Sequence, residues 1–180
     1  MRSGTIFFTC TTILLLSLRG ALASGEDAPL PLRLELLMQM SAELEDRQQV
    51  GETPVGGRRI VYVKRGQFDG ARLRGQVLPG GGDWVLVRKD GVSQLDVRIT
   101  LRTDDGALIY VTYRGLSTMT PEMRQRILKG EVVHPSEYYF RTTPVFETAA
   151  EKYAWLNKLV AVGVGRRTRT GVEYSVYAIQ

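Results

Sequence analysis

The sequence predicts an all-β fold: a small antiparallel β-barrel of about nine strands with one short helix. Three observations support this prediction. Apolar and polar residues alternate with a period of two along several segments, glycine and proline turn signals separate those segments, and only one segment carries helix-capping residues. About nine short strands place the chain among closed barrels that hold one small ligand. The length of 180 residues suits a single domain with one core.

The clearest alternation lies in residues 94–114, which read as two strands joined by a tight turn. Successive side chains of a strand point to opposite faces, so the first of these strands has one apolar and one polar face. The apolar face carries Leu95, Val97, Ile99 and Leu101, and the polar face carries Asp96, Arg98, Thr100 and Arg102.

The turn predicts the register of this hairpin. Asp104-Asp105-Gly106 suits a three-residue loop in which Gly106 takes positive φ. A two-residue loop would set Ile99 against Thr112, an apolar residue against a polar one, and is therefore rejected. The predicted cross-strand pairs are Thr103 with Ala107, Ile99 with Val111, Val97 with Tyr113, Thr100 with Tyr110, Arg98 with Thr112 and Asp96 with Arg114.

Other strands are expected on both sides of this hairpin. A glycine- and proline-containing loop over residues 51–57 separates the first two of them, and Gly75 marks a bulge or bend in the third. An aromatic connector around Tyr153 and Trp155 precedes the last hairpin. The expected strands cover residues 36–45, 59–64, 72–78, 84–88, 137–147, 159–166 and 172–179.

One short helix is predicted after the central hairpin. Thr120 is a good N-cap, Pro121 fits the first helical position, and Glu122 complements the positive end of the helix dipole. Glu122 and Arg126 have the spacing of an i, i+4 ion pair, and Gly130 ends the helix. Its length suits a plug or flap on the sheet.

Residues 1–23 have the pattern of a secretory signal peptide. Arg2 supplies the positive start, residues 5–18 the apolar region, and Ala21-Leu22-Ala23 a small-x-small cleavage site. We therefore expect a secreted or periplasmic protein with no stable membrane span after processing, a linker over residues 24–31 and a barrel domain over residues 32–180. Arg19 leaves an uncleaved anchor as the alternative.

Charge and cysteine content exclude several function classes. Removal of Arg2 and Arg19 with the signal peptide lowers the net charge of +5 by two. The remaining positive excess is small and spread along the chain, which does not indicate a nucleic-acid-binding surface. Cys10 lies in the same segment, so the mature chain has no thiol chemistry or disulfide. Without cysteine, His134 as the only histidine makes a transition-metal site improbable, and no metal or other cofactor is expected. Arg166-Arg167-x-Arg169 sits at an expected turn; a solvated turn is the first interpretation and an anion contact the alternative.

Several runs resemble a family of bacterial and fungal proteins known as domain-of-unknown-function family 3237, or uncharacterised protein family 0311. The runs are LRGQVLPGGGDW at 73–84, LRTDDGALI at 101–109, YYFRTTP at 138–144, FET at 146–148 and YAWLN at 153–157. The resemblance covers nearly all of the mature chain and implies a lipocalin-like barrel without a settled activity. A few fungal relatives are implicated in cyclisations, so it also favours pericyclic or acid–base chemistry on small organic molecules. The export signal of this chain is a departure from the family pattern, because many members lack one.

The polar face of the central hairpin is the first candidate site. Asp96, Arg98, Tyr110 and Arg114 would line the barrel lumen, where loss of solvent shifts pKa values toward those of general acids and bases. The alternative is that this face is a solvated sheet surface.

A second polar stripe follows from strand parity. Glu137, Tyr139, Arg141 and Thr143 alternate with Tyr138 and Phe140. If both stripes face one lumen, Arg98 and Arg141 would form an anion or enolate pocket beside Tyr110 and Tyr139. The alternative is an outer surface with an aromatic core behind it. Asp83 and Trp84 follow the glycine turn and would form a rim of the pocket, with Trp84 or Trp155 as its apolar wall. The alternative is that the indole rings belong to the core.

These observations predict a barrel that binds a small aromatic or enolisable organic molecule in its lumen, with Trp84, Arg98, Arg114, Tyr139 and Trp155 as binding residues. Two alternatives remain. The first is a cofactor-independent lyase, isomerase or cyclase, with Asp96 or Tyr110 as acid–base and Arg141 for charge stabilisation. The second is an interaction module that forms a homodimer through the outside of the barrel.

Overall fold

The computed structural model describes residues 29–180 of the chain, and residues 32–180 form one compact unit. The predicted signal peptide and most of the predicted linker lie outside the described residues. Among the described residues, no helix has the length and apolar character needed to cross a bilayer.

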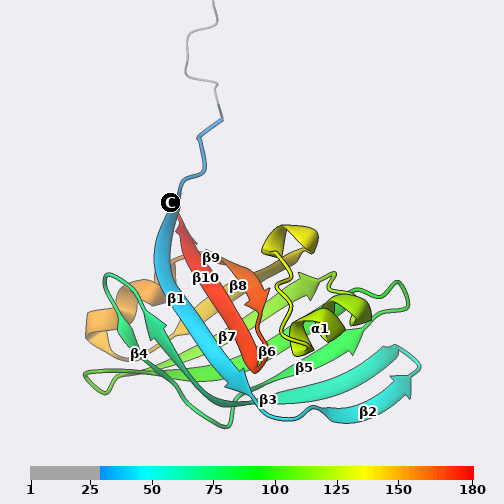
Figure 1. Ribbon diagram of the computed structural model, residues 1–180. Helices are drawn as coiled ribbons and strands as arrows, with labels where there is room; N and C mark the ends of the chain where they lie inside the picture. Colours follow the sequence, from blue (N-terminus) through cyan, green and yellow to red (C-terminus); the bar gives the residue numbers. More distant parts are fainter. Residues whose placement is uncertain (1–28) are drawn as a thin grey trace, which may run out of the picture. The chain divides into compact units, whose positions relative to one another are not determined.

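Ten strands of the described part form one antiparallel sheet that closes on itself (Figure 1). The path runs β1-β10-β9-β8-β7-β6-β4-β3, and pairing of β1 with β3 completes an eight-stranded barrel. β2 and β5 are the two additional strands. The strands are β1 Leu34–Leu44, β2 Gln48–Thr53, β3 Gly56–Asp69, β4 Arg74–Val77, β5 Gly82–Val87, β6 Ser93–Thr103, β7 Leu108–Ser117, β8 Phe140–Glu147, β9 Ala161–Arg167 and β10 Gly171–Ile179.

β4 and β5 fill the same place in the barrel wall, one after the other. Both pair with β3 and with β6, and the glycine turn at residues 79–81 separates them. Val63 N donates to Gly81 O at 2.9 Å, so the wall stays closed across this break. A Cβ at Gly81 would lie 2.6 Å from Arg98 O, and this close backbone approach explains the glycine.

The central hairpin has the predicted register. β6 and β7 pair Ile99 with Val111, Val97 with Tyr113 and Asp96 with Arg114, and Gly106 takes φ +88° in the turn. The apolar face points into the barrel: Leu101 and Ile109 are fully buried and belong to the core cluster. The all-β barrel class is confirmed.

The polar face of this hairpin points outward, so the hypothesis that it lines the lumen is wrong. Arg98, Tyr110 and Arg114 are exposed and Asp96 is partly exposed, whereas Val97 and Tyr113 between them are buried. Closing the sheet with its polar face inside would leave the apolar row in water, and burial of apolar side chains is the dominant favourable term in folding. The alternative interpretation, a solvated outer surface, describes this face.

The predicted helix is α1, Pro121–Leu128, with Thr120 as its N-cap; Met123 N donates to Thr120 Oγ1 at 3.3 Å. Ile127 anchors it to the core. The i, i+4 pair expected between Glu122 and Arg126 is replaced, because Arg126 bonds Glu131 at 3.2 Å and Glu137 at 2.8 Å beyond the end of the helix.

Other elements differ from the sequence expectation. The loop expected at residues 51–57 is the turn of the β2–β3 hairpin, because Gly51 and Gly56 take positive φ and let the strands continue to the turn. The strand expected from residue 137 begins at Phe140, after a 3-10 turn at Pro135–Glu137. The aromatic connector forms 3-10 turns at Glu151–Lys158, which bury Tyr153 and Leu156.

Candidate functional site

The strand ends nearest α1 bring four arginines together, here called the arginine cluster: Arg47, Arg59, Arg124 and Arg167. Arg59 lies an even number of positions from Val61 and Val63 on β3, so its side chain is on the same, inward-facing side of the strand. Its Nη2 donates to Ser93 Oγ at 3.3 Å. Ser93 starts β6 and pairs with Ser117, where β7 ends three residues before the α1 N-cap.

The other members of the cluster come from three further parts of the chain. Arg124 on α1 donates through Nη1 to Met119 O at 3.0 Å. Arg167 is the last residue of β9 and lies on the same, inward-facing side of the strand as Gly163 and Gly165. Its backbone amide donates to the Tyr138 hydroxyl at 3.1 Å. Arg47 lies in the short connection between β1 and β2.

The charges of these guanidinium groups act on one another's pKa values. Burial, followed by the charges of Arg124, Arg47 and Arg167, lowers the pKa of Arg59 from 12.5 to about 10. Burial and neighbouring arginine charges also lower the pKa of Arg124 and of Arg167. Four arginine side chains in one place make the cluster strongly positive.

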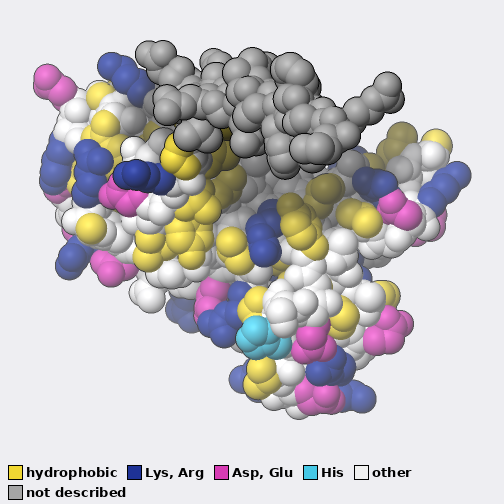
Figure 2. All heavy atoms as spheres, turned by 90° about the horizontal axis from the view of Figure 1, so that it is seen from above, with side chains coloured by type: hydrophobic (Ala, Val, Ile, Leu, Met, Phe, Trp, Pro, Cys, Tyr) yellow, Lys and Arg dark blue, Asp and Glu magenta, His cyan; other side chains and the backbone are white. Residues whose placement is uncertain are grey.

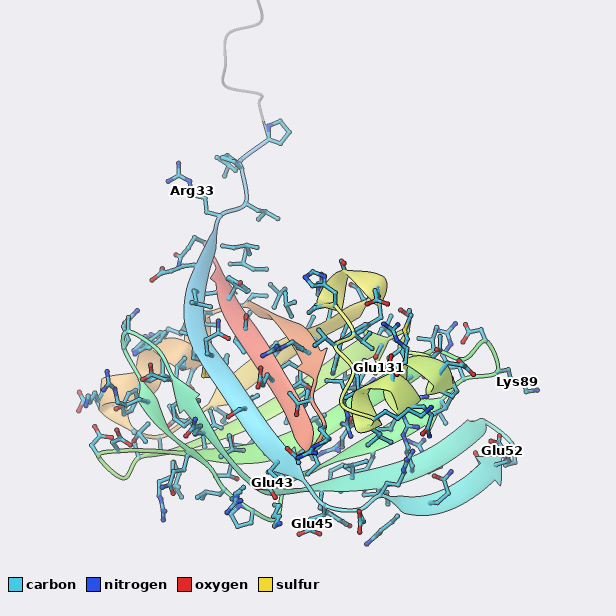
Figure 3. The ribbon with its side chains drawn as sticks, in the orientation of Figure 1. Arg33, Glu43, Glu45, Glu52, Lys89 and Glu131 are labelled. Atoms are coloured by element: carbon cyan, nitrogen blue, oxygen red, sulfur yellow. The ribbon has the colours of Figure 1, made fainter. Side chains whose placement is uncertain are left out.

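Among residues 29–180, the arginine cluster has no ion-pair partner. No carboxylate oxygen lies within 4.0 Å of a side-chain nitrogen of its four arginines. Glu43 and Glu45, labelled at the end of β1 in Figure 3, do not supply one. Glu43 is bound instead by Lys64 at 2.9 Å and Arg65 at 2.6 Å.

Asp83 is the acidic side chain that faces this region from inside the wall. On β5 it pairs with Val61 of β3 and Val97 of β6, which places it one diagonal step from Arg59 on the same face. Burial raises the pKa of its carboxyl from 3.8 to about 6, against the lowering effects of a hydrogen bond from Asp96 N and of the Arg59 charge.

Three aromatic rings form a wall across the interior beside these charges. Tyr113 on β7 meets Tyr174 on β10 edge-on, with ring centroids 5.6 Å apart, and Tyr174 meets Phe140 at 5.4 Å. Gly165 makes room, since a Cβ there would lie 2.6 Å from the Phe140 ring. Burial raises the pKa of both tyrosine hydroxyls, so both stay protonated and can donate hydrogen bonds.

The barrel interior beyond the tyrosines is filled. The cavity bounded by Tyr113, Tyr174 and the apolar side chains of β1, β7 and β10 measures only about 10 Å³, roughly the room for one water. This cavity is therefore too small for an organic ligand.

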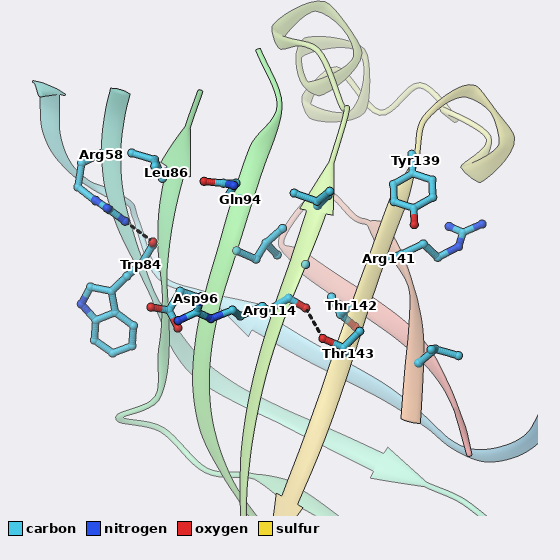
Figure 4. Close-up of a pocket in the computed structure, with 14 residues that line it drawn as sticks. Arg58, Trp84, Leu86, Gln94, Asp96, Arg114, Tyr139, Arg141, Thr142 and Thr143 are labelled. Atoms are coloured by element: carbon cyan, nitrogen blue, oxygen red, sulfur yellow. Dashed lines mark hydrogen bonds between the residues drawn. The ribbon is translucent and has the colours of Figure 1, made fainter. Parts of the chain in front are cut away.

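A larger hollow lies on the outer wall and is here called the outer groove (Figure 4). It measures about 560 Å³ and crosses β3, β5, β6, β7, β8 and β9. Five of the residues predicted for the lumen line it: Trp84, Asp96, Arg114, Tyr139 and Arg141. The two polar stripes of the sequence therefore do face one site, but outside the barrel.

Three guanidinium groups line the outer groove. Arg58 donates through Nη1 to Trp84 O at 2.6 Å, and Arg141 donates to Phe140 O at 2.9 Å with its guanidinium 5.1 Å from the centre of the Tyr139 ring. Asp96 and Arg114 are opposite in register, yet the ion pair of Asp96 is with Arg98, at 3.3 Å.

The remaining predicted residues lie elsewhere. Arg98 stands beside the groove, 5.4 Å from the centre of the Trp84 ring, without lining it. Tyr110 is on the outer face opposite Glu147, and Trp155 stacks under Arg72 at 3.6 Å. The structure therefore does not bring Tyr110 or Trp155 together with the other predicted residues.

His134 has a local structural role. Its Nδ1 accepts from Ser136 N at 3.2 Å, and its own amide donates to Glu137 Oε1 at 2.8 Å, which closes a capping box. Within residues 29–180, no group of three histidine, cysteine or acidic side chains is placed to hold a metal ion.

The sequence did not group these inner residues into one site, although it offered an anion contact as the alternative for Arg167 and a rim position for Asp83. Strand parity already grouped Val97 and Tyr113 on one face, and Arg59 shares the parity of Val61 and Val63. An arginine on an otherwise apolar face was the available signal. Asp83 carried no such signal, because its strand is too short for a clear alternation.

Comparison with known proteins identifies the fold and the family but assigns no activity. Residues 32–179 match the family described as a protein of unknown function, DUF3237. A protein of Clostridium acetobutylicum from the uncharacterised family UPF0311 is 39% identical over 125 residues, 69% of this chain and 79% of that protein. A UPF0311 protein of Rhodopseudomonas palustris is 33% identical over 148 residues, 82% of this chain and 97% of that one.

Solved structures show the same barrel. A protein of Acinetobacter baumannii described as β-barrel-like has a TM-score of 0.75 at 38% identity, covering 86% of this chain and 100% of that chain. A protein of Penicillium herquei described as an enzyme has a TM-score of 0.63 at 22% identity, covering 85% and 98%, which shows the fold alone. On the family match and these relatives, the chain belongs to the DUF3237 family of β-barrel proteins, also called UPF0311.

Proposed function

We propose that the barrel binds a small organic anion at the arginine cluster. One observation carries the proposal: four arginines from β3, β9, α1 and the β1–β2 connection converge there without a carboxylate partner among residues 29–180. Mutual repulsion of partly buried cations destabilises the empty fold, and a bound anion relieves it. Anion binding should therefore stabilise the folded state of the barrel.

The surroundings of the cluster favour an aromatic or enolisable acid as the ligand. Arginine recognises a carboxylate through two parallel hydrogen bonds, and it also stacks on flat rings. Tyr113, Tyr174 and Phe140 offer ring edges and protonated hydroxyls next to the cations. A ligand with a carboxylate or enolate at one end and an apolar body would use both features.

Ligand-induced thermal stabilisation tests the proposal. Sodium benzoate, phenylacetate and phenylpyruvate are titrated at constant ionic strength, with benzamide as the neutral analogue. We expect the anions to raise the melting temperature with increasing concentration and benzamide to have no effect, because a ligand stabilises by binding the folded state. Arg59→Gln and Arg167→Gln should remove most of the shift. Arg102→Gln is the matched control, since Arg102 contacts Gln76 on the outer face.

The outer groove is a second candidate binding site, because its volume of about 560 Å³ lies in the range of small-molecule pockets. Arg141→Ala distinguishes the two sites: it should leave the anion-induced shift unchanged if the ligand binds at the arginine cluster and reduce it if the ligand binds in the groove. The groove could instead receive a second copy of the chain. Concentration-dependent sedimentation without any anion-induced shift would favour that homodimer.

A further inference from the structure

Asp83 combines two features that ordinary structural aspartates lack. Its charge reaches Arg59 on β3 and Arg167 on β9, yet no oxygen of Asp83 lies within 4.0 Å of a nitrogen of either. A carboxylate that served only to neutralise these arginines would contact them. The Asp83 carboxylate therefore lies near the guanidinium groups of Arg59 and Arg167 without forming an ion pair with either.

The hydrogen bonds of Asp83 leave one oxygen available. Oδ1 accepts from the amide of Asp96 at 3.0 Å, where the β5–β6 ladder is interrupted between Asp83 and Leu86. Oδ2 has no donor among residues 29–180. The first bond orients the carboxyl group. Because no buried side-chain oxygen of the described residues lacks a partner, the second oxygen is accessible to solvent and to a ligand.

We propose that Asp83 is the general base of a cofactor-independent proton transfer on an enolisable carbonyl compound that carries an anionic group. This inference rests on the proposed binding of an anion at the arginine cluster. Asp83 would touch the carbon that loses the proton, and Arg59 and Arg167 would hold the oxygen on which negative charge develops.

The step balances without an oxidant or a reductant. Oδ2 takes a proton from the carbon next to the carbonyl, the C–H electron pair becomes the C=C bond of an enolate, and the carbonyl electrons move to oxygen. Fixed positive charge near that oxygen stabilises the enolate. The hydrogen now on Oδ2 is replaced by a deuteron from D₂O, and Asp83 delivers that deuteron to the same carbon, which gives exchange. Delivery of the hydrogen to a conjugated carbon gives an isomer instead.

The groups facing Asp83 suit this role over a defined pH range. They are Arg59 on β3, Arg167 on β9, Tyr113 on β7, Tyr174 on β10 and, on β6, both the backbone amide and the carboxylate charge of Asp96. Burial is the main cause of the raised pKa of Asp83, about 6, which lies close to neutral pH where a general base works best. Both tyrosines keep their protons through this range.

Deuterium exchange tests the proposal directly. Sodium levulinate, acetoacetate and phenylpyruvate are incubated with the whole barrel in D₂O, and loss of the α-proton signal is followed by NMR above the buffer rate. Methyl levulinate is the uncharged analogue. We expect exchange with at least one of the acids, a much lower rate with the ester, and a rate that rises with pH through about 6 to a plateau.

Asp83→Asn keeps an oxygen for the Asp96 amide and removes the proton acceptor. It should lower the exchange rate by a factor on the order of 10²–10⁴ while the benzoate-induced thermal shift persists. Asp104→Asn, an exposed aspartate in the β6–β7 turn, should change neither.

The results separate this inference from the proposed binding function. Anion-induced stabilisation without any exchange, or with exchange that survives Asp83→Asn, would overturn the catalytic role and leave binding intact. If the unmodified protein shows neither anion-induced stabilisation nor exchange, both the catalytic role and the proposed anion binding are overturned. If Asp83→Asn does not fold, the pH profile of the unmodified protein decides, because a rate independent of pH between 4 and 8 excludes a base with this pKa.

Discussion

At the scale of single residues, burial separates two aspartates that neighbour each other across the β5–β6 ladder. Asp83 points into the barrel, where burial raises its pKa to about 6, whereas Asp96 points outward and forms a partly exposed ion pair with Arg98. The same chemical group is therefore a candidate for proton transfer in one position and a surface charge in the other.

Asp83 should make stability depend on pH. Its folded-state pKa is raised from 3.8 to about 6, so the folded protein holds this proton more tightly than the unfolded chain. That stabilising contribution is complete below about pH 4 and is lost as the pH rises through about 6. Relative to the unmodified protein, Asp83→Asn should therefore gain on the order of 1–3 kcal/mol of unfolding free energy between pH 4 and pH 8.

Urea denaturation at both pH values measures this difference, and other titrating groups cancel in the comparison. Asp104→Asn is the control and should show no such pH-dependent gain. An Asp83→Asn variant whose stability relative to the unmodified protein is the same at pH 4 and pH 8 would contradict burial of the carboxyl group.

Asp96→Asn tests the outer position. A partly exposed ion pair contributes about 0–1 kcal/mol, so this substitution should change the midpoint of urea denaturation very little. It should also leave α-proton exchange unchanged, because Asp96 lies outside the barrel. A large loss of exchange in Asp96→Asn, with Asp83→Asn unaffected, would instead place the chemistry in the outer groove.

At the scale of elements, the β6–β7 hairpin shows how one strand serves two environments. Its inward residues belong to the core, and its outward residues form the outer groove and its surroundings. Seen from above, the surface of the molecule carries basic and acidic side chains interspersed with apolar ones (Figure 2).

Adjacent substitutions on β6 test this division. Leu101 is fully buried, and Leu101→Ala should cost about 2–5 kcal/mol through lost burial and the cavity left behind. Arg102, the next residue, points outward to Gln76, and Arg102→Ala should cost well under about 1 kcal/mol. Chemical denaturation of the two variants gives the comparison, and equal losses would contradict the inward assignment of the apolar face.

At the scale of the whole molecule, the barrel brings together four arginines that have no ion-pair partner among residues 29–180. Strands β3, β5 and β9, helix α1 and the β1–β2 connection contribute the charged side chains, and Arg47 and Arg167, 120 positions apart in the sequence, both belong to the cluster. Tyr113 and Tyr174 cross the interior and separate the cluster from the apolar core. A site of this kind exists only once the sheet has closed.

We also propose that the protein is exported. The positive start, apolar region and small-x-small pattern of residues 1–23 support cleavage after Ala23. Mass spectrometry of the protein from the extracytoplasmic fraction should find a chain that begins at Ser24, and replacing Ala21 and Ala23 by bulky residues should block that cleavage. Full-length chain carrying Met1 in the membrane fraction of the unmodified strain would support the uncleaved anchor instead.

The sequence by itself determined the features that depend on local chemistry. Alternation along residues 94–114 predicted the hairpin, Asp104-Asp105-Gly106 predicted its register, and Thr120 with Pro121 predicted the start of α1. These predictions held because a turn, a cap and a strand period each involve residues a few positions apart. The family resemblance extended the barrel prediction to nearly the whole chain, and residues 32–179 match that family.

Only the tertiary structure decided which face of the sheet lies inside and which distant side chains meet. Strand parity divides residues into two sets but does not name the inner one, and closure of the barrel turned the apolar set inward because its burial stabilises the fold most. Arg59, Asp83 and Arg167 lie on three strands whose neighbours are set by sheet order. Their convergence is a property of that long-range pairing, which no short stretch of the chain encodes.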